Sequence, residues 1–401
     1  VLRLYRAQGA IVAVSDGSIH STGNDALSIT VSAAALGKFK WALSSPQVSG
    51  AAFSGTNTLS AQDDWGNTVT TFDASASNVT LSTSLGGTIS GLGSGTNDIL
   101  NRSADFSTGV ANLTALGMKY TGPVGTGVFT ATSSGKAGTS DSVVISAGTA
   151  TRLVLTGTAT QVAGTAQNLT ITARDESNNI VVGYAGSKNL TFSGAASGTN
   201  PVTPPTVANS AGLAVAFGSP TALTFTNGIA TVAGSANGTM RLYRVESAII
   251  SVTDGTISSQ LTDRLTVGVT PGALGQFAWT LVSPQVNGLT FTGTNTLVAQ
   301  DDWGNTVPTF NAATNNVTIT TSLPGSPQAI TGLGSLDNNV LNQAGNFTSG
   351  VSNLTALGMK YSGSSGTGTF TATSAVGSKA GTSAVVTMNN PVPTLTSVVP
   401  G

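Results

Sequence analysis

Apolar and polar residues alternate in short runs along most of the chain, which is the pattern of half-buried β-strands. Residues 127–132 and 151–156 are clear examples, and Phe39 and Trp41 would share one face of a strand. Gly, Ser and Asn separate the runs, and no segment has apolar residues at helical spacing supported by helix-forming residues. The pattern therefore predicts an all-β fold of short strands joined by tight turns.

Three of the strand-like runs end in the same kind of turn. Residues 61–69 read Ala-Gln-Asp-Asp-Trp-Gly-Asn-Thr-Val, residues 299–307 repeat this sequence letter for letter, and residues 173–181 are a looser copy. An Asp at the start of such a turn can accept backbone N–H groups, and Gly or Asn tolerates positive φ. We therefore expect three hairpins of one kind, with positive φ at Gly66, Asn178 and Gly304.

Long internal repeats indicate how the chain is divided. Arg-Leu-Tyr-Arg at 3–6 returns at 241–244, and Leu-Gly-Met-Lys-Tyr at 116–120 returns at 357–361, with three extra residues that we place near Ser326. A chain of 401 residues suits about three domains. The fold class we predict is all-β, with tandem Ig-like antiparallel β-sandwiches in an elongated array.

The repeats also predict the domain boundaries. Residues 34–148 and 272–389 would be two copies of one type of sandwich, and residues 149–271 a second type. Residues 1–33 duplicate 239–271, so they would be the C-terminal strands of a truncated domain, and 390–401 would be the first strand of a following one. We expect additional loops around 86–105, 195–218 and 324–346.

Composition narrows the function classes. Charged residues are 8% of the chain and the net charge is −1, which argues against nucleic-acid partners. Cys is absent, which excludes disulfides and thiol chemistry. No apolar run is long enough for membrane insertion. Polarity without charge suits an extracellular bacterial protein, at the cell surface or secreted. His20 is the single His, so no triad or His metal set can form, and we expect no enzyme activity and no cofactor.

The acidic residues are few, and two adjacent pairs of them are candidates for metal binding. The pairs Asp63-Asp64 and Asp301-Asp302 are a weak candidate for Ca²⁺ binding, because carboxylate oxygens are the ligands this ion prefers. The other interpretation is that one Asp of each pair caps its turn and the other is solvated. Lys119 and Lys360 lie in otherwise apolar strands, where each could form an isopeptide crosslink or extend its ammonium group to the surface.

Aromatic and basic residues suggest weak candidate contact sites. Trp65 and Trp303 at the turn tips could stack on sugar rings, or could fold back as lids over the core. A second set consists of two tyrosines and the arginines beside them, and it could contact a neighbouring domain or subunit. An ordinary charged edge strand would contain the same kinds of residue. This assembly set comprises Arg3, Tyr5, Arg6, Arg241, Tyr243 and Arg244.

The turn motif Ala-x-Asp-x-x-Gly-Asn-x-Val, together with the strands at 127–132 and 368–373, resembles the Ig-like repeats of invasin- and intimin-type bacterial surface proteins. The segment 393–400 is similar to the first strand of the IPT/TIG Ig-like family. The resemblance implies a non-catalytic segment of an extracellular bacterial fibre, stalk or surface layer. The alternative is an adhesin module that binds carbohydrate or a cell-surface receptor through its loops and Trp-bearing tips, and a third is a phage-tail or capsid module.

The expected partners follow from this interpretation. We expect self-association or head-to-tail continuation of a larger polypeptide, because six apolar residues of 1–33 would otherwise have no facing sheet. These residues are Leu4, Val12, Val14, Leu27, Ile29 and Val31. Either the preceding part of the same polypeptide or a neighbouring subunit would cover them.

Overall fold

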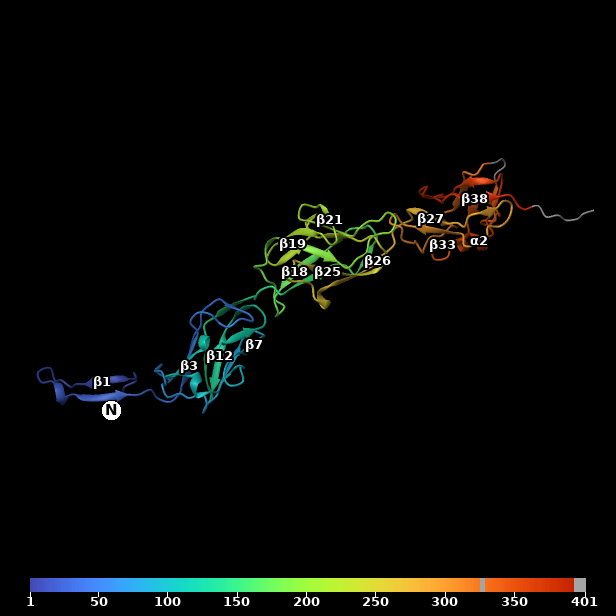
Figure 1. Cartoon of the computed structure of the whole chain (residues 1–401). Coiled ribbons are helices and arrows are strands. Elements are labelled where there is room, and N and C mark those ends of the chain that lie inside the picture. Colours follow the sequence, from blue (N-terminus) through green and yellow to red (C-terminus); the bar gives the residue numbers. More distant parts are fainter. Residues whose placement is uncertain (325–328, 393–401) are drawn as a thin grey trace, which may run out of the picture. The chain divides into compact units, whose positions relative to one another are not determined.

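The computed structural model describes residues 1–324 and 329–392, and the chain forms two compact units. Unit 1 comprises Val1–Val154, Thr172–Gly186 and Phe225–Ile229, and unit 2 comprises Leu155–Ile171, Ser187–Thr224 and Ala230–Gly401. The division passes through β15 (Arg152–Thr156), β18 (Thr170–Arg174) and β23 (Ile229–Thr231). Strands dominate both units, so the all-β prediction is confirmed (Figure 1).

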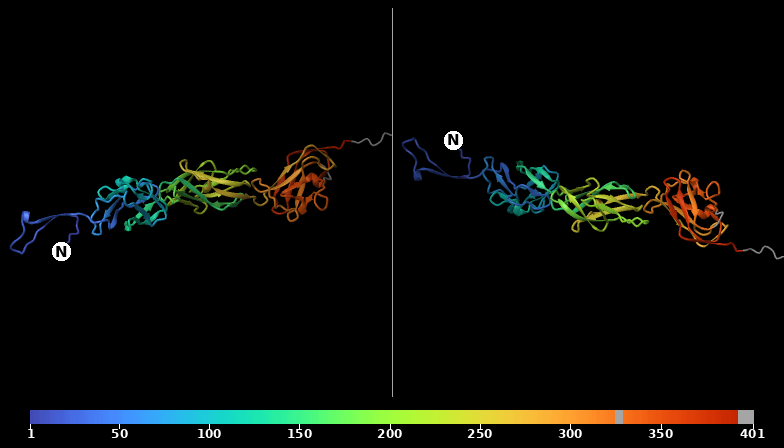
Figure 2. Two further views of the ribbon diagram at one scale, coloured as in Figure 1. Left: turned by 90° about the horizontal axis from the view of Figure 1, so that it is seen from below. Right: turned by 90° about the horizontal axis from the view of Figure 1, so that it is seen from above.

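Unit 1 begins with an isolated hairpin. Strand β1 (Gln8–Val12) pairs antiparallel with β2 (Leu27–Val31), with Gln8 opposite Val31 and Val12 opposite Leu27. The two strands form a sheet by themselves, and both views of Figure 2 show the hairpin in dark blue without a third strand beside it. A two-stranded hairpin buries little apolar area by itself and is marginally stable in water.

Residues 34–148 of unit 1 build four small sheets around one hydrophobic core. The sheet orders are β3-β5-β9, β13-β12-β6-β8, β11-β14-β4 and β10-β7. The strands are β3 (Lys38–Ala42), β4 (Gln47–Val48), β5 (Thr58–Gln62), β6 (Val79–Thr83), β7 (Thr88–Ser90), β8 (Ile99–Leu100), β9 (Val110–Asn112), β10 (Lys119–Thr121), β11 (Gly125–Gly127), β12 (Phe129–Ser133), β13 (Lys136–Thr139) and β14 (Val143–Ser146).

Unit 2 repeats this arrangement in residues 272–389. The corresponding orders are β27-β29-β33, β37-β36-β30-β32, β35-β38-β28 and β34-β31. The strands are β27 (Gln276–Thr280), β28 (Gln285–Val286), β29 (Thr296–Gln300), β30 (Val317–Thr321), β31 (Ala329–Thr331), β32 (Val340–Leu341), β33 (Val351–Asn353), β34 (Lys360–Ser362), β35 (Gly366–Gly368), β36 (Phe370–Ser374), β37 (Ala380–Thr382) and β38 (Val386–Asn389). The repeat in the sequence is therefore a repeat of topology.

Residues between 160 and 270 build a five-stranded sheet and a four-stranded sheet, most of which belong to unit 2. Their orders are β16-β26-β25-β19-β22 and β17-β24-β20-β21. The strands are β16 (Thr160–Val162), β17 (Gln167–Asn168), β19 (Gly186–Ser193), β20 (Thr206–Ala208), β21 (Ala214–Ala216), β22 (Pro220–Phe225), β24 (Thr239–Arg241), β25 (Ser247–Thr253) and β26 (Leu265–Thr270). Strands β25 and β26 are the sequence copies of β1 and β2.

The two repeat copies have equivalent cores. Phe39 and Trp41 face inward from β3, as their alternation predicted, and the Trp41 indole donates a hydrogen bond of 2.9 Å to the Gly138 carbonyl. In the second copy the Trp279 indole donates to the Gly381 carbonyl at 2.8 Å. A buried indole N–H needs such an acceptor, so this contact fixes the first strand over the sheet that it covers.

The structure corrects several details of the sequence prediction. Two one-turn helices, α1 (Leu113–Leu116) and α2 (Leu354–Leu357), stand where strand or loop was expected. Asn112 caps α1 by accepting from the Ala115 N–H, and Gly117 ends it with φ 83°, so local capping replaces the missing helical periodicity. In the described part of the chain, four 3₁₀ turns add short helical segments at Gly23–Asp25, Ser103–Asp105, Leu261–Asp263 and Ala344–Asn346.

The sheets are also less uniform than expected. Pairs β4–β14, β16–β26 and β28–β38 are parallel. The expected extra loops contain strands, among them β7, β8, β20, β21 and β31. Residues 326 and 393–400 lie outside the described residues, and the predicted domain boundaries stay a prediction.

Candidate assembly site

The three predicted turns are local hydrogen-bond networks around a buried Asp. At Asp63, the Oδ1 atom accepts from the Trp65 N–H at 3.0 Å and the Asn67 N–H at 2.9 Å. The Asp63 N–H in turn donates to the Asn67 carbonyl, which closes the loop. Gly66, Asn178 and Gly304 have φ of 88°, 69° and 83°, so the predicted positive φ is confirmed at all three turns. The hairpin itself is a single bridge, Gln62 to Thr68, rather than a second strand.

The second oxygen of Asp63 reaches outside the turn. Asp63 Oδ2 accepts from the Ala34 N–H at 3.1 Å and from Asn67 Nδ2 at 2.8 Å. The same Asn67 amide donates to the Tyr5 carbonyl at 2.7 Å, and its Oδ1 accepts from the Ala7 N–H at 2.8 Å. Asp63 and Asn67 together therefore hold the backbone before β1, at Tyr5 and Ala7, and the backbone after β2, at Ala34.

Asp301 and Asn305 make the same contacts in unit 2. Asp301 accepts from the Gly272 N–H at 2.9 Å and from Asn305 Nδ2 at 2.8 Å. Asn305 donates to the Tyr243 carbonyl at 2.7 Å and accepts from the Val245 N–H at 2.8 Å. Both side chains are buried, and the exposed fraction of Asp301 is 0%.

Asp175 and Asn179 complete the series in unit 1. Asp175 accepts from the Gly148 N–H at 3.0 Å and from Asn179 Nδ2 at 2.9 Å. Asn179 donates to the Gly122 carbonyl at 3.0 Å and accepts from the Val124 N–H at 3.1 Å. We call Asp63–Asn67, Asp175–Asn179 and Asp301–Asn305 the Asp–Asn pairs. In each pair the Asp binds backbone where the sequence repeats predict one domain to end and the next to begin, and the Asn binds backbone earlier in the chain.

The hydrogen bonds stabilise the charged form of Asp63. Burial by itself would raise the pKa of its carboxyl group, but hydrogen bonds from the Asn67 side chain and from the Ala34, Asn67 and Trp65 N–H groups outweigh burial. The net result is a pKa below the ordinary value of an aspartate. This turn is therefore most stable where Asp63 is ionised.

The structure assigns different roles to the adjacent acids of the calcium candidate. Asp63 and Asp301 direct both oxygens at N–H donors, so a cation would have to displace those donors. Asp64 is exposed, and the Asp302 side chain is 62% exposed with one ion pair of 3.8 Å to Lys379. Among residues 1–324 and 329–392, no three His, Cys, Asp or Glu side chains gather as a metal site.

Trp65 and Trp303 pack on tyrosines rather than on a core. The ring centres of Tyr5 and Trp65 are 5.3 Å apart, and those of Tyr243 and Trp303 are 5.6 Å apart. Neither Trp belongs to the hydrophobic cluster of its repeat copy, so the interpretation as a lid over the core is wrong. The turn places each Trp beside the preceding segment because Asn67 and Asn305 fix the neighbouring backbone there.

The assembly set divides into residues with contacts and residues at the surface. Tyr5 and Tyr243 contribute their carbonyls to the Asp–Asn pairs and their rings to the Trp contacts. Arg241 donates from Nη1 to the Gly164 carbonyl at 2.6 Å. The remaining members, Arg3, Arg6 and Arg244, are exposed.

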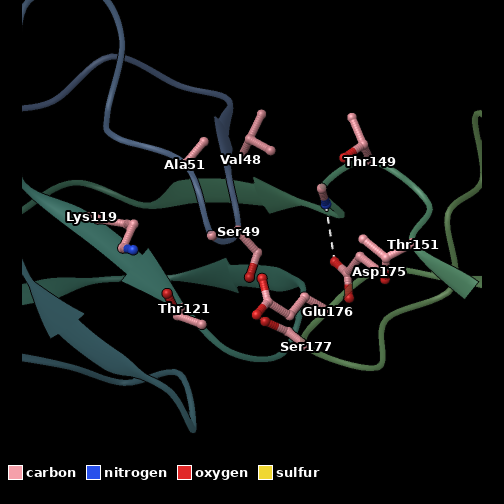
Figure 3. Close-up of a pocket in the computed structure, with 12 residues that line it drawn as sticks. Val48, Ser49, Ala51, Lys119, Thr121, Thr149, Thr151, Asp175, Glu176 and Ser177 are labelled. Carbon is pink, nitrogen blue, oxygen red and sulfur yellow. Dashed lines mark hydrogen bonds between the residues drawn. The ribbon is translucent and has the colours of Figure 1, made fainter.

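An open pocket of about 470 Å³ adjoins the Asp175 turn in unit 1. Figure 3 shows Lys119 and Thr121 on one side, Glu176 and Ser177 near the middle, and the hydrogen bond from the Gly148 N–H to Asp175 at the other side. Lys119 and its copy Lys360 are half-buried. Whether Lys119 or Lys360 forms a crosslink stays a prediction.

Sequence reasoning missed the asparagines. Asn67, Asn179 and Asn305 each follow their Asp by four residues, and this spacing was visible in all three copies of the turn. The backbone groups that they bind lie about 60 residues earlier in the chain, so only the fold reveals their partners. Within the described ranges, no helix has the length and apolar character of a membrane span.

Comparisons with known proteins add the following findings. No protein-family model matches the chain, and no curated protein matches it. Among solved structures, the Yersinia pseudotuberculosis adhesin InvE is similar at 16% identity and a TM-score of 0.23, covering 69% of this chain and 75% of the adhesin. A β-glycosidase from Bacteroides vulgatus is similar at 10% identity and a TM-score of 0.20, covering 60% of this chain.

A β-glucuronidase from Parabacteroides merdae is similar at 9% identity and a TM-score of 0.19, covering 60% of this chain. This chain spans about a quarter of the length of each of these two glycosidases.

Proposed function

We propose that the chain is a non-catalytic structural segment of an extracellular bacterial fibre, stalk or surface layer. The observation that carries the proposal is the threefold recurrence of the Asp–Asn pair, in which the Asp binds backbone next to a predicted domain boundary and the Asn binds backbone earlier in the chain. Repetition of a contact whose atoms bind only backbone of the same chain supports a mechanical role. A catalytic site would need reactive groups that this contact does not present.

The chemistry of the pairs suits a boundary that must resist bending. Hydrogen bonds to an ionised carboxylate contribute more than neutral ones, about 1.5–3 kcal/mol each. Cys is absent from the sequence, so no disulfide takes part in these contacts. The proposed segment would therefore keep its domain-to-domain geometry through changes of salt and redox conditions.

An adhesin function is the second candidate, because the Trp65 side chain is 57% exposed at a turn tip. Exposed aromatic rings can stack on sugar rings. A glycan array probed with the whole chain separates the two candidates. We expect no bound glycan for a structural segment, and binding that disappears in Trp65→Ala would favour the adhesin.

Distance measurements between spin labels test the structural proposal. Since the chain has no Cys, Thr266→Cys and Thr318→Cys would be the sole labelling sites, and both side chains are exposed. We expect a narrow distance distribution in the parent chain and a broad one after Asn305→Ala. The exposed Asn189→Ala is the matched control and should leave the distribution narrow. Equal widths in all three proteins would contradict the proposal.

A further inference from the structure

Residues 1–33 and 239–271 are copies in sequence but differ in environment. Leu4 is 37% exposed and its copy Leu242 is 1% exposed, while Val14 is 76% exposed and its copy Val252 is 2% exposed. Leu2 is likewise exposed where its copy, Met240, is fully buried. Contiguous apolar exposure of this kind marks a surface that another polypeptide covers.

Ile11 and its copy Ile249 show which face of the hairpin stays exposed in both copies. Ile11 is 76% exposed, and its copy Ile249 remains 53% exposed although it lies in a five-stranded sheet. Because side chains alternate across a strand, Val12 and Val14 lie on the opposite face from Ile11. We call Leu2, Leu4, Ala10, Val12, Val14, Ile29 and Val31 the inner face of the hairpin.

The second copy shows which strands lie beside the two strands of the hairpin. Strand β19 pairs antiparallel with β25, with Phe192 opposite Val252, and Phe192 is buried. Strand β16 pairs in parallel with β26, with Gln161 opposite Val269. The corresponding positions at the first hairpin are Val14 and Val31, and neither β1 nor β2 has a further paired strand.

The surroundings of Trp303 and Trp65 give independent evidence that a chain segment lies beside the second copy and not beside the first. Trp303 is half-buried, and a Cβ atom added to Gly164 would lie 2.0 Å from its ring. The Trp303 carbonyl also accepts from the Thr199 and Asn200 N–H groups at 3.1 and 3.2 Å. Trp65 has the same turn and the same tyrosine contact, yet its side chain is 57% exposed.

The glycines that follow the two tryptophans show the same difference in their surroundings. A Cβ atom on Gly304 would meet Thr199 Oγ1 at 2.7 Å, whereas one on Gly66 would have only Gln62 Oε1 at 4.0 Å. The space beside Trp65 is therefore open where a chain segment lies beside Trp303.

We propose that the inner face of the hairpin and Trp65 form a docking surface for a polypeptide segment of the same type as residues 149–238. The occupant carries a strand like β19 next to β1, a strand like β16 next to β2, and a glycine that seats Trp65 as Gly164 seats Trp303. Because Gly238 joins this segment to Thr239 in the second copy, we assign the occupant to the same polypeptide as the hairpin. The inference holds whether the array is a spacer or an adhesin.

Polar groups at the edge of the hairpin fit this occupant. Glu246 accepts from the Ala196 N–H at 2.7 Å, and its copy Gln8 keeps an acceptor oxygen. Arg241 donates to the Gly164 carbonyl at 2.6 Å, and its copy Arg3 is exposed with the same donor group. The hairpin thus retains the donors and acceptors as well as the apolar face.

A fusion that places a second copy of residues 149–238 directly before Val1 of the full chain tests the proposal. We expect amide exchange of Ala10 and Val12 to slow to the level of their copies Ala248 and Ile250. Acrylamide quenching of Trp65, identified by comparison with Trp65→Phe, should fall to the level of Trp303. The unfused chain should show fast exchange and strong quenching at these positions.

Matched variants separate docking from general stabilisation. In the fusion, Val14→Asp should abolish the protection of the hairpin, whereas Ile11→Asp on the outer face should leave it in place. Gly164→Leu in the fused copy should keep Trp65 open to acrylamide while β1 and β2 stay protected.

Three results would overturn the proposal. The first is a fusion in which exchange and quenching match those of the unfused chain, whether the added segment folds or not. The second is equal loss of protection from Val14→Asp and Ile11→Asp. The third is an unfused chain whose hairpin is already protected in a concentration-dependent dimer, since a second copy would then be the occupant. The spin-label widths across the Asp301 turn are unaffected by any of these results, so the proposed function is tested separately.

Discussion

The Asp175 turn and the Asp301 turn share their hydrogen bonds but differ in their aromatic contacts. Both have an Asp that accepts from a linker N–H and an Asn that binds backbone about 60 residues earlier. The Asp301 turn adds Trp303 packed against Tyr243, where the Asp175 turn has Ser177. The Asp–Asn pair is therefore the common element of the three turns, and the Trp is an addition specific to two of them.

The largest effect should come from removing the common element. Asp301→Ala leaves the Gly272, Trp303 and Asn305 N–H groups without their acceptor, at a cost of about 3 kcal/mol or more. Its exposed neighbour provides the control, because Asp302→Ala loses one solvent-exposed ion pair worth about 0–1 kcal/mol. Denaturant unfolding of the two variants measures the difference, and similar midpoints would show that the buried turn is not special.

Removing a Trp should destabilise the protein less than removing Asp301, and the loss should differ between Trp303 and Trp65. Trp303→Ala removes a half-buried ring packed against Tyr243 and Gly164, which we expect to cost about 2 kcal/mol. Trp65→Ala should cost less than about 1 kcal/mol, because the Trp65 side chain is largely exposed. Thermal unfolding of both variants measures the ratio. A larger loss for Trp65 would contradict the comparison of the two turns.

The glycine at the turn tip allows a finer comparison. Gly304→Ala meets Thr199 and Asn200 in addition to requiring positive φ, whereas Gly66→Ala has only the backbone cost of about 1–2 kcal/mol. We expect the Gly304 variant to be the less stable of the two. Asn178→Gly, at a turn that already has φ 69°, should change the unfolding free energy by less than either.

Acid should weaken the Asp63 turn. The folded-state pKa of Asp63 lies below its unfolded value, so its contribution is fully present above about pH 4 and is lost as the pH falls through the folded pKa. Hydrogen exchange at Ala34 should therefore accelerate, after correction for the intrinsic rate, between neutral pH and pH 3. In Asp63→Asn, exchange at Ala34 should be faster at neutral pH and show less additional acceleration in acid.

Metal removal should have the smallest effect. The oxygens of Asp63 and Asp301 already accept N–H donors, so we expect EDTA to leave the melting temperature unchanged. A rise of several degrees on adding Ca²⁺ would reinstate the calcium site, because a ligand that binds only the folded state stabilises it. In that case Asp64→Ala and Asp302→Ala would identify which acid of each pair binds.

The sequence by itself determined the local features of the protein. Alternation placed Phe39 on an inward face, and the Asp-to-Gly or Asp-to-Asn spacing predicted the three turns with positive φ. Those features depend on neighbouring residues, whose φ preferences and side-chain directions are set within a few bonds. The exact repeat of residues 61–69 likewise predicted that two turns would be alike.

Only the tertiary structure decided the contacts between distant residues. Asn67 binds the backbone of Tyr5, and Asn179 binds that of Gly122, across about 60 residues whose strand pairing no local pattern specifies. The parallel pairs and the strands within the expected loops arise in the same way, since a short run takes its partner from whichever edge the fold brings near. The same sequence copy is buried at Val252 and exposed at Val14, because burial is a property of the surrounding chain and not of the residue.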